Sequence, residues 1–264
     1  MSPVFDETRC VRCSACIADC VCGILSFGED GFPTVLPGME NRCVRCGHCV
    51  AICPAGAAIL NGMPPSPCPS VKDASLAEAS LDALLKGRRA MRQYANGAVP
   101  RHLLEKAFEY AAYAPTAHNS REVAYTVLNG RGQVEHLLDN LVRHMEIHGL
   151  YPAHTKNVRQ GKDTLFRGAP CLILIHAPDR LLSESDCATA AAYLEIALHG
   201  LGLGSCWAGM LIEACHPGLP EGLAIPEGHR LYAALMAGIP RARYTLLPFR
   251  SAPSVTWRED AIKP

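Results

Sequence analysis

The chain has 264 residues, with 25 basic and 25 acidic side chains and a formal net charge of zero at pH 7. This balance gives no electrostatic reason to expect a nucleic-acid partner. Apolar runs such as Cys171–Ile175 and Leu231–Ala237 are too short to span a membrane, and the first residues lack the basic and apolar regions of a secretory signal. We therefore expect a cytoplasmic protein of one or two domains.

Two cysteine runs with the same spacing, C-x2-C-x2-C-x3-C, lie 33 residues apart near the start of the chain. Their members are Cys10, Cys13, Cys16 and Cys20 in the first run, and Cys43, Cys46, Cys49 and Cys53 in the second. Closely spaced thiolates favour zinc or an iron–sulfur cluster. Zinc sites usually show two separated pairs of ligands, and a disulfide framework needs an oxidising compartment. The pattern therefore favours iron–sulfur clusters over these two alternatives.

Pro54 directly follows the second run. With this proline and the two cysteine runs, residues 3–60 resemble bacterial two-cluster ferredoxins. In these proteins the fourth cysteine of each run binds the other cluster. The resemblance implies two [4Fe–4S] clusters, one held by Cys10, Cys13, Cys16 and Cys53 and the other by Cys43, Cys46, Cys49 and Cys20. The first run departs from the pattern because Val21 and Cys22 follow it in place of a proline. A segment this short needs its clusters for folding free energy.

A proline-rich stretch separates this cysteine segment from the rest of the chain. Residues 24–36 alternate around Glu29–Gly31 and predict a short hairpin. Residues 61–70 contain four prolines, which forbid a helix and favour an extended spacer. We predict a cluster domain at 1–62, a proline-rich linker at 63–75 and a second domain at 76–264.

The second domain alternates between helical and strand patterns. Helical periodicity predicts helices at 75–86, 99–113, 133–148 and 186–201. Buried apolar runs predict strands at 123–128, 168–177 and 231–240. The helix at 186–201 is apolar on nearly all faces, so we expect it at the domain centre or in a subunit interface. Residues 151–162 and the tail from 241 show no clear period.

Arg88, Arg89 and Arg92 lie just outside a predicted helix. Guanidinium groups can bind phosphate in a bidentate manner, although such a cluster by itself is more often a solvated surface. Five segments, this one included, resemble motifs of the FMN-dependent nitroreductase family, in the family's order over residues 80–255. They are Arg88–Tyr94, Ala114–Ser120, Gly168–Leu174, Leu201–Gly209 and Gly238–Pro240.

This resemblance implies an α+β fold, with a central mixed or antiparallel sheet surrounded by helices, and a homodimer with FMN at the subunit interface. The residues implied to bind FMN are Arg88, Arg89, Ala90, Arg92, Pro115, Thr116, Ala117, Asn119, Trp207, Ala208, Gly209 and Arg250. The arginines at 88, 89 and 250 would hold the phosphate, and Arg92 would reach the pyrimidine edge of the flavin. The loop at 115–119 would line the flavin from the neighbouring subunit.

Residues 207–209 would lie over the ring near N5 and offer backbone N–H groups. Two departures from the family stand out. Ala90 replaces a common serine, and Arg121–Val123 replaces a Q-P-W sequence. The second change alters the rim of the site.

The combined resemblances imply an oxidoreductase that passes electrons from two clusters to FMN and then to a nitro, quinone or enone acceptor. NAD(P)H is an additional candidate donor, although no Rossmann fingerprint is present. No catalytic side chain is assigned, because hydride transfer occurs at FMN N5. The alternatives are a redox-sensing or electron-transfer module that serves a ferredoxin or other protein partner, and a scaffold without flavin. We expect His144, His148 and His154 on helix surfaces, and His118 as a proton donor or an exposed loop residue.

Overall fold

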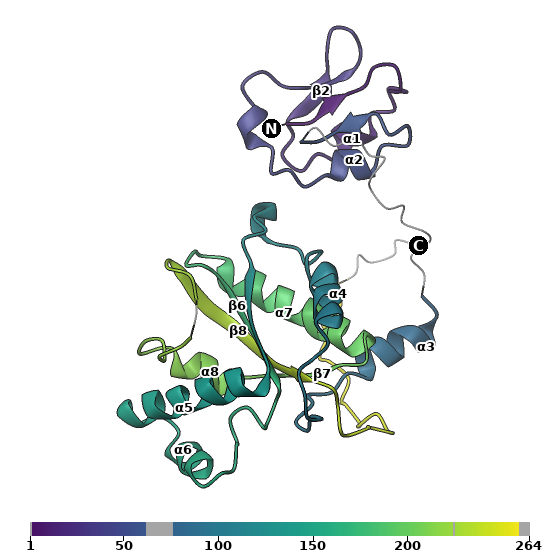
Figure 1. The fold of residues 1–264 in the computed structure, drawn as a ribbon. Coiled ribbons are helices and arrows are strands. Elements are labelled where there is room, and N and C mark those ends of the chain that lie inside the picture. The colour runs from purple at the N-terminus through teal and green to yellow at the C-terminus, as the bar shows by residue number, and fades with distance from the viewer. Residues whose placement is uncertain (1, 62–75, 224, 259–264) are drawn as a thin grey trace.

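The computed structural model describes residues 2–61, 76–223 and 225–258 (Figure 1). The linker predicted at 63–75 lies outside the described residues. Within the described ranges, no helix combines the length and the apolar character needed to cross a membrane.

Residues 2–61 form two small antiparallel sheets with short helices between them. The strands are β1 (Val4–Phe5) paired with β4 (Ala58–Ile59), and β2 (Leu25–Phe27) paired with β3 (Pro33–Val35). The helices are α1 (Ala15–Ala18), η1 (Glu40–Arg42) and α2 (His48–Ala51). The β2–β3 pair confirms the hairpin predicted at 24–36.

The internal repeat extends from the sequence to the backbone. Helix α1 follows Ser14 at φ 62°, and α2 follows Gly47 at φ 79°. The arginine inside each cysteine run is also left-handed, with φ 56° at Arg12 and 52° at Arg45. These matching conformations give the two runs the same backbone course.

The second domain is built on a four-stranded antiparallel sheet in the order β5-β6-β8-β7. Its strands are β5 (Ala124–Asn129), β6 (Cys171–Pro178), β7 (Gly204–Trp207) and β8 (His229–Gly238). Its helices are α3 (Glu78–Leu81), η2 (Asp82–Lys86), α4 (Arg101–Ala111), η3 (Ala117–Asn119), α5 (Arg131–Ile147), α6 (Pro152–Arg159), α7 (Ser183–Gly200) and α8 (Gly209–Ala214). The prediction of an α+β fold is confirmed.

Side chains of β6 alternate between two hydrophobic layers. Ile173 and Ile175 pack with α4 and α7, whereas Leu172 and Leu174 pack with α5 and α8. The sheet therefore lies between two helical layers, as Figure 1 shows. Both faces of β6 are buried, which explains why its sequence is a continuous apolar run.

Three parts of the domain differ from the prediction. The helix predicted at 75–86 is divided into α3 and a π-helical turn, η2. Strand β7 and helix α8 follow the helix predicted at 186–201, in residues for which neither a strand nor a helix was predicted. Helix α6 lies within 151–162, where Pro152 occupies its first position.

Candidate functional site

The arginine segment lies along the outer edge of β7. Ala90 forms a parallel bridge with Ser205, and the Met91 N–H donates to the Ser205 carbonyl oxygen at 2.8 Å. The Tyr94 hydroxyl donates to the Met91 carbonyl oxygen at 2.6 Å, and its ring is buried. Burial is the main cause that raises the pKa of Tyr94. This buried anchor fixes the course of the chain immediately after the arginines.

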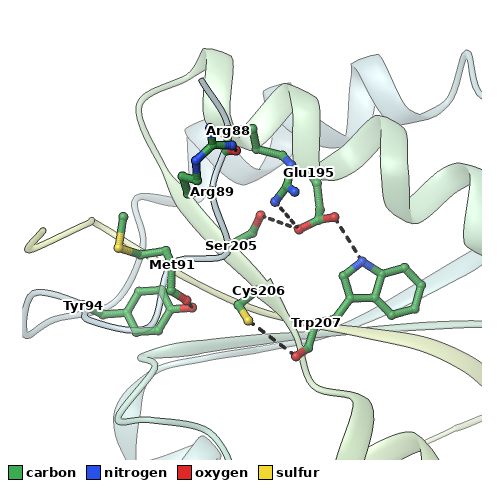
Figure 2. Close-up of polar contacts among 8 residues, drawn as sticks. All are labelled: Arg88, Arg89, Met91, Tyr94, Glu195, Ser205, Cys206 and Trp207. Atoms are coloured by element: carbon green, nitrogen blue, oxygen red, sulfur yellow. Dashed lines mark hydrogen bonds and ion pairs between the residues drawn. The ribbon is translucent and has the colours of Figure 1, made fainter. Parts of the chain in front are cut away.

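A buried carboxylate connects three elements of the site (Figure 2). Glu195, on α7, accepts hydrogen bonds from the Arg88 guanidinium at 3.3 Å and the Ser205 hydroxyl at 3.2 Å through Oε1. Its Oε2 accepts a hydrogen bond from the Trp207 indole at 3.0 Å. Glu195 is only 8% exposed, so these donors replace the water that it loses on burial.

A cavity of about 230 Å³ opens beside this network. Its lining includes Arg88, Arg89 and Arg243, together with Gly204 and Ser205. Three guanidinium groups around one cavity can bind an anion such as phosphate. Arg243 was missed in the sequence because it lies in the tail without periodicity; its only signal was its position shortly after β8.

The structure places two other predicted residues away from this cavity lining. Arg250 is exposed in the C-terminal segment, and Arg243 lies at the cavity instead. Arg92 is also exposed and lies near the buried Cys206 thiol. Burial raises the pKa of that thiol, and the charge of Arg92 partly opposes the effect.

Residues 207–209 lie at the junction of β7 and α8. Trp207 is 39% exposed, although its indole N–H is held by Glu195. The Ala208 N–H donates to the Ala234 carbonyl oxygen at 2.8 Å, so in this conformation it is not free for a ligand. At Gly209, an added Cβ would meet no heavy atom within 4 Å. The backbone there faces open space that a flat ligand could approach.

In the structure, the loop at 115–121 borders a different cavity from the arginine segment. Pro115 is exposed, and the Ala117 N–H donates to the Asp186 carboxylate of α7 at 2.9 Å. A cavity of about 320 Å³ adjoins this loop, and its lining includes Ala117, His118 and Asp186. The arginine segment and this loop thus line two separate cavities. Within the described residues, the chain does not bring Thr116 or Asn119 into the lining of the arginine cavity.

The first three cysteines of the second run surround one cavity together with the last cysteine of the first run. Its lining includes Cys20, Cys43, Cys46 and Cys49, and also Cys22. Burial raises the pKa of Cys49 to about 11, and the charges of Cys46 and Cys43 add to this effect. These four thiols are the set that the sequence assigned to one cluster.

Three members of the other predicted set, Cys10, Cys16 and Cys53, lie near one another. Burial raises the pKa of Cys16, and the nearby charges of Cys53 and Cys10 raise it further. The Ala57 N–H donates to the Cys53 sulfur at 3.2 Å, which favours its thiolate form. Cys13, the fourth member of this predicted set, is exposed. Across the described residues, no three histidine, cysteine or acidic side chains converge tightly enough for a single metal ion.

The histidines have structural partners or are exposed. The ring of His144 hydrogen-bonds the Ala214 carbonyl oxygen at 2.9 Å, and that of His154 hydrogen-bonds the Thr164 hydroxyl at 2.9 Å. His148 and His118 are exposed. His144 therefore connects α5 to α8, and His154 connects α6 to the segment that contains Thr164.

Comparisons with known proteins agree with this architecture. A family model described as "Nitroreductase family" matches residues 85–239, and one described as "4Fe-4S dicluster domain" matches residues 9–57. A protein of Methanothermobacter thermautotrophicus, named as an NADH dehydrogenase/NAD(P)H nitroreductase, is 25% identical over 174 residues. That match covers 64% of this chain and 81% of the relative.

Solved structures share the fold of the second domain. A nitroreductase from Bacteroides fragilis, crystallised with bound FMN, is 24% identical, with a TM-score of 0.57. One from Desulfitobacterium hafniense, also with bound FMN, is 20% identical, with a TM-score of 0.56. Each match covers 70% of this chain and 100% of the other. Because the first family model spans more than half of the sequence, the chain belongs to the nitroreductase family of oxidoreductases, with a 4Fe-4S dicluster domain at its N-terminus.

Proposed function

We propose that the protein is an FMN-dependent oxidoreductase in which two [4Fe–4S] clusters supply electrons for the reduction of an organic acceptor of the nitro, quinone or enone type. FMN, when bound, takes up electrons singly or in pairs and reduces the acceptor, while each cluster carries single electrons. The observation that carries the proposal is the arginine-lined cavity beside β7, in a chain of the nitroreductase family.

The residues around this cavity fit a flavin phosphate. Arg88, Arg89 and Arg243 supply guanidinium donors, and Gly204 and Ser205 belong to the same lining. The bound FMN in the two nitroreductase structures with this fold supports the same cofactor here. Arg92, Ala90 and Arg250 remain predicted cofactor residues.

Three residues would orient the flavin without taking part in bond changes. Glu195 holds the Arg88 guanidinium and the Trp207 indole at fixed positions relative to each other. Tyr94 anchors the segment that carries the arginines. Gly209 leaves room for a planar ring, because no atom occupies the position of a Cβ there. Such fixed geometry limits the reorganisation needed during electron transfer.

The cysteines fit two clusters with crossed ligand sets. We assign Cys10, Cys13, Cys16 and Cys53 to one cluster, and Cys43, Cys46, Cys49 and Cys20 to the other. The shared cavity around the second set and the mutual influence of Cys10, Cys16 and Cys53 support this division. Soft thiolates in this number suit iron–sulfur chemistry.

We also propose a cytoplasmic homodimer, with the loop at 115–119 of one subunit facing the arginine cavity of the other. An exposed apolar groove of about 480 Å³ supports this assembly. It lies between α4 and α7 and is lined by residues that include Tyr110, Tyr113, Tyr193 and Leu201. Exposed apolar surface of this kind favours burial against another protein surface.

The test begins with anaerobic protein assayed for iron, sulfide and FMN. A Cys10→Ser, Cys43→Ser, Cys53→Ser variant should retain FMN but lose flavin reduction by an external low-potential donor. Cys215→Ser, which alters a thiol outside both sets, is the matched control. If the triple variant reduces acceptors at the full rate with NADPH, the clusters are not the electron source.

The acceptor is tested by flavin reoxidation. Nitroaromatics or quinones should reoxidise the reduced protein directly. Reoxidation that requires a second protein would instead indicate an electron-transfer or redox-sensing module. NAD(P)H is tested in the same assay as an additional donor.

A further inference from the structure

Among the described residues, one side chain joins the two domains by hydrogen bonds. The side-chain amide of Asn119, in η3, donates to the carbonyl oxygens of Val44 and Arg45, each at 3.1 Å. Figure 1 shows the turn that contains Asn119 projecting from the second domain towards the N-terminal domain. The acceptors belong to the peptide chain between Cys43 and Cys46. The loop therefore binds the backbone that surrounds one proposed cluster.

The loop is constructed to present this amide. Asn119 has φ 53°, a left-handed conformation that asparagine tolerates better than most residues. The Arg121 guanidinium donates to the amide oxygen of Asn119 at 3.1 Å. The Arg121 N–H donates to the Thr116 hydroxyl at 3.1 Å. Because Arg121 occupies the oxygen end of the amide, the NH₂ end must face Val44 and Arg45.

The internal repeat supplies a comparison within the molecule. Val11 and Arg12 occupy the same positions in the first run as Val44 and Arg45 in the second. The side chain of Arg12 packs within the N-terminal domain, with its guanidinium 4.1 Å from the centroid of the Phe32 ring. In the ranges that the structure covers, only the second run receives hydrogen bonds from the loop. The two similar runs thus occupy different positions relative to the second domain.

We propose that the cluster held by Cys43, Cys46, Cys49 and Cys20 is the one that delivers electrons to the flavin site, with Asn119 as its docking residue. Arg121 is the positioning residue that orients this amide. The inference rests on the proposed function and adds the order of the two clusters. Electron transfer slows steeply with distance. In the proposed dimer the loop at 115–119 faces the arginine cavity of the other subunit, so the cluster whose loop is held by Asn119 is the one placed beside that flavin site. Each transfer oxidises this cluster by one electron, and two transfers supply the pair that reduces one acceptor molecule.

This role differs from the one that family resemblance implies for Asn119. The resemblance makes Asn119 a flavin residue, whereas here both ends of its amide are used by Arg121 and the cluster loop. It also gives a reason for Arg121, which replaces the usual family residue at this position. The two roles predict different defects when Asn119 is changed.

Asn119→Asp is the sharpest variant, because it preserves size and left-handed preference but replaces the NH₂ donor with a carboxylate oxygen, an acceptor that repels the two carbonyl oxygens. Asn119→Gly also preserves the backbone and removes the amide. Ser120→Ala, in the adjacent exposed position, is the control. In anaerobic holoprotein, a pulse of dithionite reduces the clusters, and flavin reduction is followed by absorbance. The rate in the Cys10→Ser, Cys43→Ser, Cys53→Ser variant, which measures direct reduction of the flavin by dithionite, is subtracted. We expect about a tenfold slower transfer in both Asn119 variants, as for the loss of one or two hydrogen bonds.

Spectroscopy and cofactor affinity separate the outcomes. The electron paramagnetic resonance signal and midpoint potential of one cluster should shift in Asn119→Asp, while those of the other cluster and the FMN dissociation constant stay unchanged. Arg121→Gln should give a smaller change in the same direction. Normal transfer in both Asn119 variants, or loss of FMN affinity with normal transfer in the molecules that retain FMN, would overturn the inference. If the clusters of the unmodified protein reduce no flavin, the proposed function itself fails.

Discussion

At the scale of single residues, the site depends on a carboxylate that no cofactor motif contains. Glu195 joins α7 to the arginine segment and to β7 through three hydrogen bonds. A carboxylate beside Arg88 reduces its net positive charge, so its presence needs a positional reason. That reason is the fixed spacing between the guanidinium that would bind phosphate and the indole that would lie over the ring.

Glu195→Ala should lower the free energy of unfolding of the second domain by about 2 kcal/mol, because three donors lose their acceptor. Glu195→Gln should cost less, since the amide oxygen still accepts a hydrogen bond. Both variants should bind FMN more weakly. Thermal unfolding and flavin fluorescence quenching measure these effects. Equal stability and FMN affinity in the original protein and Glu195→Ala would show that the network does not position the site. Glu213→Ala, on the exposed surface of α8, serves as the control.

At the scale of elements, the close approach between β7 and the arginine segment shapes the cavity. A Cβ at Gly204 would lie 2.6 Å from Met91 Cγ and 2.7 Å from Met91 Cβ. Only glycine lets the segment lie this close to the strand. The segment is also held on its other side, where the Ala95 N–H donates to the Ile239 carbonyl oxygen at 2.8 Å.

Gly204→Ala should therefore displace the arginine segment from β7. We expect a loss of about 1–3 kcal/mol in stability, as for overpacked cores, and weaker FMN binding because Arg88 and Arg89 move with the segment. Calorimetry and FMN titration provide the measurements. Gly132→Ala is the matched control, because a Cβ there meets no atom within 4 Å and should stabilise α5. Unchanged FMN affinity in Gly204→Ala would contradict this account of the cavity.

These elements also show how much of the fold and of the site could be predicted from the sequence. The strand β6 and the helix α7 have long apolar patterns, and both were predicted. Strand β7 has four residues beside several glycines, so local pattern could not separate it from a loop. Glu195 and Arg243 were missed because their roles depend on which elements become neighbours in space. The cysteine sets could be assigned from the sequence, since ligand chemistry depends directly on residue type and spacing, and this assignment stays a prediction.

At the scale of the whole molecule, the two domains differ in how many apolar side chains they bury. The second domain buries two extensive apolar layers around its sheet. The N-terminal domain has a small buried cluster, Cys16, Ile24 and Leu25, against which partly buried Phe5, Ile17, Val35, Met39 and several cysteines pack. Ala57, Ala58 and Leu60 are buried as well. So small a core cannot offset the entropy of ordering some sixty residues without the bound clusters.

Removal of iron should therefore unfold residues 2–61 and leave the second domain folded. In the full chain, calorimetry before and after anaerobic chelation should show one transition lost and the other nearly unchanged. Limited proteolysis should cut the N-terminal domain of the iron-free protein, and mass spectrometry would locate the cuts. Cys20→Ser should produce part of the same loss, whereas Cys215→Ala should leave the N-terminal transition intact. An iron-free N-terminal domain that resists protease would mean that its apolar core suffices, contrary to the dependence on clusters argued from Cys16, Ile24 and Leu25.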